Sequence, residues 1–302
     1  MTPAGLIALT AGASSAVIDP RLGGALLDLS HAGEPVLRRA SEEALRTLGV
    51  RAAACYPLLP YANRIAGGQL PAAGRIFTLR ANFPPEPHAV HGLGWQRPWE
   101  LVRAEASMAE LILQYEADTP ADWPFAFEAR QSFELDGSGL AIELSLTNRD
   151  VSAWPAGLGL HPNFPLRTGA SLQFEAAGAW SNGPDHLPAD PVCGAAWDFT
   201  KARPIAALAL DHDFHGWRGQ ARIGTGTGTG FGSASAIRIC ASEVFSVLRV
   251  FTAVGRGFFA VEPMTHVADA VHRPVFAGSG YRLLQPGETL TGTVAIMLEE
   301  AE

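Results

Sequence analysis

A histidine and a glutamate in apolar surroundings are the side chains of this sequence best suited to transfer protons. His161 lies in the run Gly-Leu-Gly-Leu-His-Pro-Asn-Phe, and Glu262 ends an apolar run directly before Pro263. A carboxyl group buried at the end of a strand has a raised pKa, which suits a general base near neutral pH. The alternatives are a hydrogen-bonded core histidine and a glutamate that lies in solvent just past the end of its strand.

Two further clusters carry groups that bind polar ligands. In the run Pro-Tyr-Ala-Asn-Arg-Ile, Asn63 and Arg64 are embedded among apolar residues. The guanidinium of Arg64 suits pairs of sugar hydroxyls, although it could instead tie loops together through their carbonyl oxygens. His88 and His91 follow a Pro-Pro-Glu-Pro run that disfavours a helix. An extended segment directs the two imidazoles to different sides, which favours a hydrogen bond to a ligand or loop over a metal site.

The elements that must position these residues are predicted to be β-strands. Leu140, Ile142, Leu144 and Leu146 alternate with smaller or polar residues, so they fall on one face of a strand. An Asp-Gly-Ser-Gly turn joins this strand to the preceding segment 133–135. The two segments are therefore predicted to form a hairpin.

Several other segments have strand or turn patterns. A Gln-Pro-Gly-Glu turn predicts a closing hairpin between residues 281–284 and 289–298. Residues 101–116 and 246–262 are also predicted to be strands, and residues 40–48 a short helix. The Gly-Thr repeat that begins at Gly224 is predicted to be a flexible loop, because the helix and lysine of a phosphate-binding loop do not follow it.

The composition indicates one globular, all-β domain over residues 1–302. Hydrophobic residues make up 47% of the chain and charged residues 17%, which is ample for a large core. β-Sandwiches of more than about 200 residues commonly form a single domain. The 22 basic and 30 acidic residues give a net charge of −8, which disfavours nucleic acid as a partner.

The same composition argues against export and membrane insertion. No segment approaches the roughly 20 apolar residues that span a bilayer, and no basic residue precedes the first apolar run. Cys55, Cys193 and Cys240 form no C-x-x-C pair, so reduced thiols are expected. We therefore expect a cytoplasmic protein.

Together, the order, spacing and flanking residues of these clusters resemble the aldose 1-epimerase (galactose mutarotase) family. The resemblance extends from residue 57 to residue 288. It implies a large, twisted antiparallel β-sandwich of the galactose mutarotase type. The matching segments are Asn63-Arg64-Ile65, His91-Gly92 with Trp95 close behind, His161-Pro-Asn-Phe164, Asp211-His-Asp-Phe214, Val261-Glu262 and a late Pro-Gly-Glu turn.

The resemblance also implies a reaction that needs no cofactor and no metal. Such enzymes interconvert the α and β anomers of an aldose by opening and reclosing its ring, with one base and one acid. The matches make Glu262 the base and His161 the acid. They assign sugar binding to four further residues, with Asp213 as a substitute for Asp211, and ring stacking to two aromatic ones. The sugar-binding set is Asn63, Arg64, His91 and Asp211, and the aromatic pair is Trp95 and Phe164.

Two other functions on the same fold remain open at this point. A phosphosugar 1-epimerase would need phosphate contacts, for which Arg64, Arg75 and Arg97 are candidates. A non-catalytic carbohydrate-binding protein would keep the binding residues without turnover. In each case the partner is a small-molecule sugar, and the protein is expected to be a monomer or a homodimer.

Overall fold

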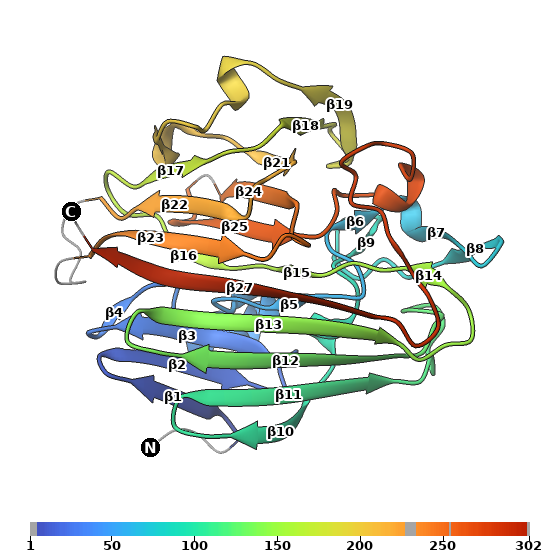
Figure 1. Cartoon of the computed structure of the whole chain (residues 1–302), viewed down its shortest axis with the longest axis horizontal. Helices are drawn as coiled ribbons and strands as arrows, with labels where there is room; N and C mark the ends of the chain where they lie inside the picture. The colour runs from blue at the N-terminus through green and yellow to red at the C-terminus, as the bar shows by residue number, and fades with distance from the viewer. Residues whose placement is uncertain (1–4, 227–233, 254, 301–302) are drawn as a thin grey trace.

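The computed structural model describes residues 5–226, 234–253 and 255–300, and it is built mainly from antiparallel β-strands (Figure 1). The largest sheet has nine strands, seen in Figure 1 from β10 at the bottom, through β13 and β27, to β22 near the top. Its strands, in spatial order, are β10 (Glu100–Ala104), β11 (Met108–Tyr115), β12 (Phe127–Leu135), β13 (Gly139–Asn148), β27 (Thr289–Glu300), β23 (Ala234–Ala241), β22 (Gln220–Gly224), β17 (Ser171–Phe174) and β20 (Arg203–Pro204).

A second sheet of eight strands carries most of the residues discussed below, and a third sheet of four strands begins the chain. The order of the second is β19 (Pro188–Val192), β18 (Gly178–Asn182), β21 (Asp211–His215), β24 (Val247–Ala253), β25 (Phe258–Met264), β15 (Gly159–Leu160) and β5 (Pro57–Leu58), with β16 (Asn163–Pro165) also paired to β25. The third contains β1 (Ile7–Ala11), β2 (Ser14–Asp19), β3 (Ala25–His31) and β4 (Glu34–Pro35).

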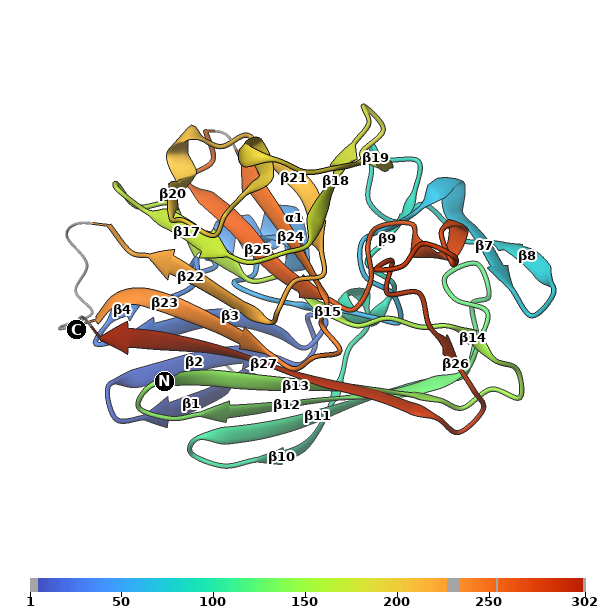
Figure 2. The same cartoon turned by 45° about the horizontal axis from the view of Figure 1, so that its top comes forward.

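Three two-stranded pairs and a few short helices complete the described chain. The hairpin of β7 and β8 projects from the right-hand edge of the molecule in Figures 1 and 2. The pairs are β14 (Trp154–Pro155) with β26 (Leu283–Leu284), β6 (Arg64–Ile65) with β9 (Ala89–Val90), and β7 (Gln69–Ala72) with β8 (Arg75–Thr78). The helices are α1 (Glu42–Leu48) and the 3₁₀ turns Gly49–Ala52, Ala66–Gly68, Gly94–Gln96, Ala195–Trp197, Ile205–Ala207 and Ala270–His272.

One continuous hydrophobic core joins the three sheets. It combines inward side chains of the nine-stranded sheet, such as Phe133, with Ile18 of the four-stranded sheet and Val250 of the eight-stranded sheet, none of them more than 1% exposed. Burying each such side chain stabilises the fold by about 1.5–3 kcal/mol. Sheets that share one core in this way form a sandwich, so the predicted all-β sandwich is confirmed.

Most of the predicted elements are present, and one pairing is wrong. Strands β12 and β13 form the predicted hairpin, and the predicted short helix is α1, capped by Ser41. The segments predicted as strands at 101–116 and 246–262 each contain two strands, β10 with β11 and β24 with β25. The predicted closing hairpin does not form, because β26 pairs with β14 while β27 pairs with β13 and β23.

Two further predictions concern the Gly-Thr repeat and membrane-spanning segments. β22 ends at Gly224, and the Gly-Thr repeat continues into residues 227–230, which lie outside the described residues. Within the described residues, no helix has the length and apolar character needed to cross a membrane.

Candidate active site

A row of charged side chains crosses three neighbouring strands of the eight-stranded sheet. Glu262 in β25 lies opposite Arg249 in β24, and Arg249 lies opposite Asp213 in β21. Residues that are opposite each other in a sheet project from the same face. All three are almost fully buried, at 2%, 2% and 0% exposure. The reading of Glu262 as a buried residue within its strand, rather than a solvated one beyond it, is therefore the correct one.

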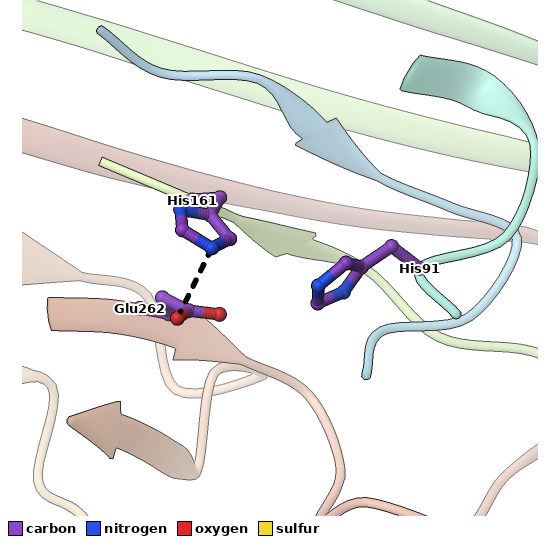
Figure 3. Close-up of side chains that lie close together, drawn as sticks. All are labelled: His91, His161 and Glu262. Carbon is purple, nitrogen blue, oxygen red and sulfur yellow. Dashed lines mark ion pairs between the residues drawn. The ribbon is translucent and has the colours of Figure 1, made fainter. Parts of the chain in front are cut away.

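His161 extends this row to the next strand. It lies between β15 and β16, which pair with β25 in one register: Gly159 is opposite Met264, and Asn163 is opposite Ala260. That register places His161 opposite Glu262, and its Nε2 lies 3.4 Å from Glu262 Oε1 (Figure 3). The side chain of His161 is 14% exposed, so the row reaches solvent at this end.

Burial moves the proton affinities of these two neighbours in opposite directions. It raises the pKa of Glu262 to about 8, with help from the charges of Asp211 and Asp213 and against the opposing charge of Arg249. It lowers the pKa of His161 to about 3. At neutral pH the Glu262 carboxyl group is therefore protonated and the His161 imidazole is neutral. The two side chains together hold one titratable proton, on Glu262.

An aromatic side chain fixes the orientation of the His161 ring. The ring of Tyr56 stacks on that of His161, with centroids 4.6 Å apart and planes 19° from parallel. The backbone N–H of His161 also donates to the carbonyl oxygen of Tyr56, at 3.0 Å. Tyr56 therefore positions the imidazole from one side while Glu262 faces it from another.

His91 approaches the pair from a separate segment, after β9. Figure 3 shows its ring directed toward His161 and Glu262, and one ligand-type atom of each of the three residues lies within 4.8 Å of the others. The backbone N–H of Asn63 donates to His91 Nδ1 at 3.0 Å, so the ring proton of neutral His91 is on Nε2. Burial keeps His91 neutral by lowering its pKa far below the ordinary value. His91 therefore offers a hydrogen-bond donor.

Two imidazoles and a carboxylate are also a set of residues that bind metal ions. We expected no metal from the sequence. An ion at His91 would require an unprotonated Nε2, which in the neutral ring means moving the proton to Nδ1 and breaking the hydrogen bond from Asn63. The hydrogen bonding of His91 thus suits an oxygen acceptor, such as a sugar hydroxyl, better than a cation.

The turn at His91 depends on the glycine that follows it. His91 and Gly92 both adopt left-handed conformations, with φ of 62° and 68°. A Cβ atom on Gly92 would lie 2.1 Å from the carbonyl oxygen of Leu59, which also accepts the N–H groups of Leu93 and Gly94. Only glycine fits this approach, so the backbone requires Gly92 directly after His91.

Gly92→Ala is therefore expected to lower the free energy of unfolding by at least about 1–3 kcal/mol. Gly137→Ala is the matched control, since no atom lies within 4 Å of a Cβ at that position. Thermal denaturation followed by circular dichroism compares the two variants. Equal melting temperatures would contradict the expected clash at Leu59.

Arg64 is held by a carboxylate rather than by loop carbonyls. Its Nε and Nη2 donate to the two carboxylate oxygens of Glu86 at 2.6 and 2.7 Å, and its Nη1 donates to Asn63 Oδ1 at 3.0 Å. The ion pair is largely buried, with side chains 10% and 18% exposed. A bidentate contact of this kind fixes the plane of the guanidinium. Arg64 is therefore a rigid and largely neutralised part of the site.

Asp211 and Asp213 both pair with Arg249. Arg249 Nη1 donates to Asp213 Oδ1 at 2.7 Å, and its Nη2 contacts Asp211 Oδ1. Asp213 also accepts the backbone N–H of Ala268. Burial would raise the pKa of Asp211, but the charges of Arg249 and Arg64 outweigh it, and the pKa lies below the ordinary value. Both aspartates are thus bound to protein groups, and Asp213 is too deeply buried to replace Asp211 at the surface of the site.

The two predicted stacking residues lie in hydrophobic clusters. Phe164 is 1% exposed and stacks on Phe259 in the main core. Trp95 is 5% exposed, donates from Nε1 to the carbonyl oxygen of Gly92, and packs near Tyr56. Phe164 therefore supports the sheet, and Trp95 supports the wall that carries His91.

Several polar atoms that have no partner collect around these residues. Glu262 Oε2, His161 Nδ1 and Asn63 Nδ2 are buried without a hydrogen bond to any described residue. Buried polar atoms normally find a partner, and a polar ligand bound beside these three residues would supply one. A polyhydroxylated ligand has the donors and acceptors to do so.

Residues that the sequence patterns did not single out also contact the predicted site residues. They are Tyr56, which stacks on His161, Glu86, which binds Arg64, Arg249, which joins the two aspartates to Glu262, and His186, which contacts Asp211. Arg249 had one usable signal, because it is a lone cation within the apolar run Val-Leu-Arg-Val-Phe of β24.

Comparisons with known proteins bear on the family and the fold of the chain. The family model described as Aldose 1-epimerase matches residues 5–297. The uncharacterized protein YphB of Escherichia coli K12 is 29% identical over 272 residues, covering 88% of this chain and 89% of YphB. A crystal structure of an E. coli K12 protein, described provisionally as an aldose 1-epimerase, superimposes with a TM-score of 0.86 at 26% identity, covering 98% and 99% of the two chains.

A more distant relative has the same fold. A galactose mutarotase-like protein from Clostridium acetobutylicum superimposes with a TM-score of 0.83 at 17% identity, covering 97% of this chain and 95% of its own. The match of the family model to nearly the whole sequence decides the assignment. The chain belongs to the aldose 1-epimerase family.

Proposed function

We propose that this protein is an aldose 1-epimerase that interconverts the α and β anomers of an aldose by acid–base catalysis, with Glu262 as base and His161 as acid. The observation that carries the proposal is the contact of 3.4 Å between His161 Nε2 and Glu262 Oε1. The two groups hold one titratable proton between them. The buried site around them contains further polar atoms without a partner among the described residues. An acid and a base side by side are what hemiacetal opening requires.

The reaction runs through an open-chain aldehyde. Glu262 takes the proton of the anomeric hydroxyl, the C1–O1 bond becomes a carbonyl, and the bond from C1 to the ring oxygen breaks. His161 gives its proton to that ring oxygen. After rotation about the C1–C2 bond the ring closes on the other face, His161 takes its proton back, and Glu262 returns a proton to O1. No electrons are exchanged with a cofactor in this sequence.

The pKa directions explain how the pair favours the open-chain stage. The cycle starts with an anionic Glu262 and a protonated His161, and ring opening leaves both residues neutral. Burial favours the neutral state, because it raises the pKa of Glu262 and lowers that of His161. Before ring opening the proton has to move from Glu262 to His161, a transfer that leaves the net charge of the pair unchanged. Ring opening then returns the pair to the neutral state that burial favours, so the open-chain stage carries no buried charge on either residue.

The charges around the site favour a neutral sugar over a phosphosugar. Arg38, Arg64 and Arg249 contribute three positive charges, and Glu86, Asp211 and Asp213 contribute three negative ones, a net charge of zero (3 − 3) while Glu262 is protonated. The guanidinium groups of Arg64 and Arg249 already bind carboxylates, and a phosphate would have to compete with them.

The other two arginines considered for phosphate binding are engaged elsewhere. Arg75 lies over the ring of Phe77, with the guanidinium carbon 4.2 Å from the ring centroid. Arg97 Nη2 donates to Asp122 at 2.9 Å. Neither contact involves a residue of the row.

The test is NMR exchange spectroscopy on anomer interconversion, with a panel of free and 6-phosphorylated aldoses. We expect catalysis above the spontaneous rate for at least one free aldose, with weaker catalysis for its 6-phosphate. Binding of a sugar without any acceleration would instead favour the non-catalytic carbohydrate-binding protein. Faster turnover of a phosphosugar would overturn the charge argument.

The shared proton predicts a pH profile. The one-proton state of the pair exists between the two pKa values, about 3 and about 8. Above about pH 8 the last proton leaves Glu262, so kcat/KM is expected to fall roughly tenfold per pH unit. The enzymatic rate, corrected for spontaneous mutarotation, measures this fall in kcat/KM directly. A rate that stays level from pH 7 to pH 10 would rule out the shared proton.

A further inference from the structure

The turn at residues 183–187, between β18 and β19, is fastened to the candidate site. His88 accepts the backbone N–H of Gly67 at Nδ1, so its Nε2 carries the proton and donates to the carbonyl oxygen of Asp185 at 3.1 Å. At the other end of the turn, Arg273 Nη2 donates to the carbonyl oxygen of Pro188 at 2.7 Å. The segment that carries His91 and the segment that carries Asp185 are thus joined through His88.

His186 lies at this turn and faces Asp211. Its backbone is left-handed, with φ of 61°, and its Nδ1 lies 3.0 Å from Asp211 Oδ2. The other carboxylate oxygen of Asp211 contacts Arg249. Both oxygens of Asp211 are therefore occupied by protein groups, and His186 stands between Asp211 and solvent.

The outer nitrogen of His186 is available to a ligand. The side chain is 52% exposed, whereas that of Asp211 is 23% exposed. Asp211 engages Nδ1 of His186, which leaves Nε2 as the ring nitrogen that can contact a ligand. Within the described chain, Nε2 of His186 has no hydrogen-bond partner.

We propose that His186 binds the substrate through a hydrogen bond between Nε2 and a sugar hydroxyl, and that the turn 183–187 determines which aldoses are accepted. The inference rests on the proposed function and extends it. Asp211 fixes the orientation of the His186 imidazole through its contact with Nδ1. The hydroxyl bound by His186 is one remote from the Glu262–His161 pair, so its loss affects binding rather than proton transfer.

The variant His186→Asn isolates the outer nitrogen. The side-chain amide of Asn places a donor near the position of Nδ1, and Asn tolerates a left-handed backbone, so the contact with Asp211 and the turn are kept. Only the Nε2 position is removed. We expect KM to rise about 3- to 10-fold, the effect of one neutral hydrogen bond, while kcat stays within about twofold.

The matched control is His272→Asn, because His272 Nδ1 also contacts an aspartate, Asp269, at 2.7 Å. It is expected to leave KM unchanged. The decisive measurement compares wild type and His186→Asn on the best aldose and on its monodeoxy analogues. For the analogue that lacks the hydroxyl bound by His186, the two proteins should give the same KM.

The outcomes separate this inference from the proposed function. If wild type turns over an aldose and His186→Asn matches it on every sugar, the inference fails and the proposed function stands. An equal loss on every deoxy analogue would mean a purely structural turn and would also overturn the inference. If wild type accelerates no sugar, the proposed function fails, and ligand-observed NMR of sugar binding to the two proteins then decides the role of His186.

Discussion

Replacing Glu262 with Gln is expected to lower kcat/KM for anomer interconversion about a hundredfold to ten-thousandfold, the typical contribution of one positioned base. The amide keeps the size and shape of the side chain but cannot take the proton of the anomeric hydroxyl. NMR exchange or polarimetry on the best aldose of the panel measures the loss. KM should change far less than kcat, because Arg64 and His91, the predicted sugar-binding residues, are unchanged.

Folding and specificity controls accompany this variant. Thermal unfolding should show no loss of stability, because burial opposes the charge of Glu262 and the amide carries none. Glu110→Gln, on the nine-stranded sheet and 30% exposed, is the matched substitution and should keep full activity. A Glu262→Gln protein with the wild-type rate would identify some other group as the base.

Arg249→Met is expected to lower the free energy of unfolding by about 3–5 kcal/mol, the usual effect of removing one partner from a buried ion pair. Its side chain is 3% exposed and neutralises Asp213, which is fully buried. Removing the guanidinium leaves Asp211 and Asp213 without their ion pair to Arg249, beside Glu262. Denaturant unfolding of the purified protein gives the difference.

The comparison for this prediction is Arg39→Met. Arg39 pairs with Asp28 at 3.0 Å, but its side chain is 54% exposed, so about 0–1 kcal/mol is expected. Equal losses in the two variants would show that burial adds nothing to the Arg249 pairs. If Arg249→Met does not fold, the double variant with Asp213→Asn should recover stability, because it removes one of the stranded charges.

The sequence allowed the elements of the fold to be predicted well wherever the signal was local. Alternation identified β13, and a turn of Asp, Gly and Ser identified its partner, since both features lie within a few residues. The wrong hairpin at the end of the chain shows the limit of such signals. β26 is only two residues long and pairs with β14, about 130 residues earlier, so nothing local specifies its partner.

The site shows the same limit. His161 and Glu262 stood out because polar residues in apolar runs are conspicuous, yet their contact depends on a sheet register that only the fold reveals. Phe164 illustrates the reverse error. An aromatic residue three positions after a site histidine suggests stacking on a ligand, but the alternation of β16 turns its ring into the core.

The row across the eight-stranded sheet also determines at which stage of folding the His161–Glu262 pair can form. Its members are Asp213, Arg249, Glu262 and His161, with Tyr56 beside the last, and they span 207 positions of the chain (262 − 56 + 1). No hairpin or local unit contains both His161 and Glu262, so a partly folded chain has no active pair. Recovery of the proposed epimerase activity after dilution from denaturant would therefore report completion of the sheet. Circular dichroism would also register the hairpins that form before it.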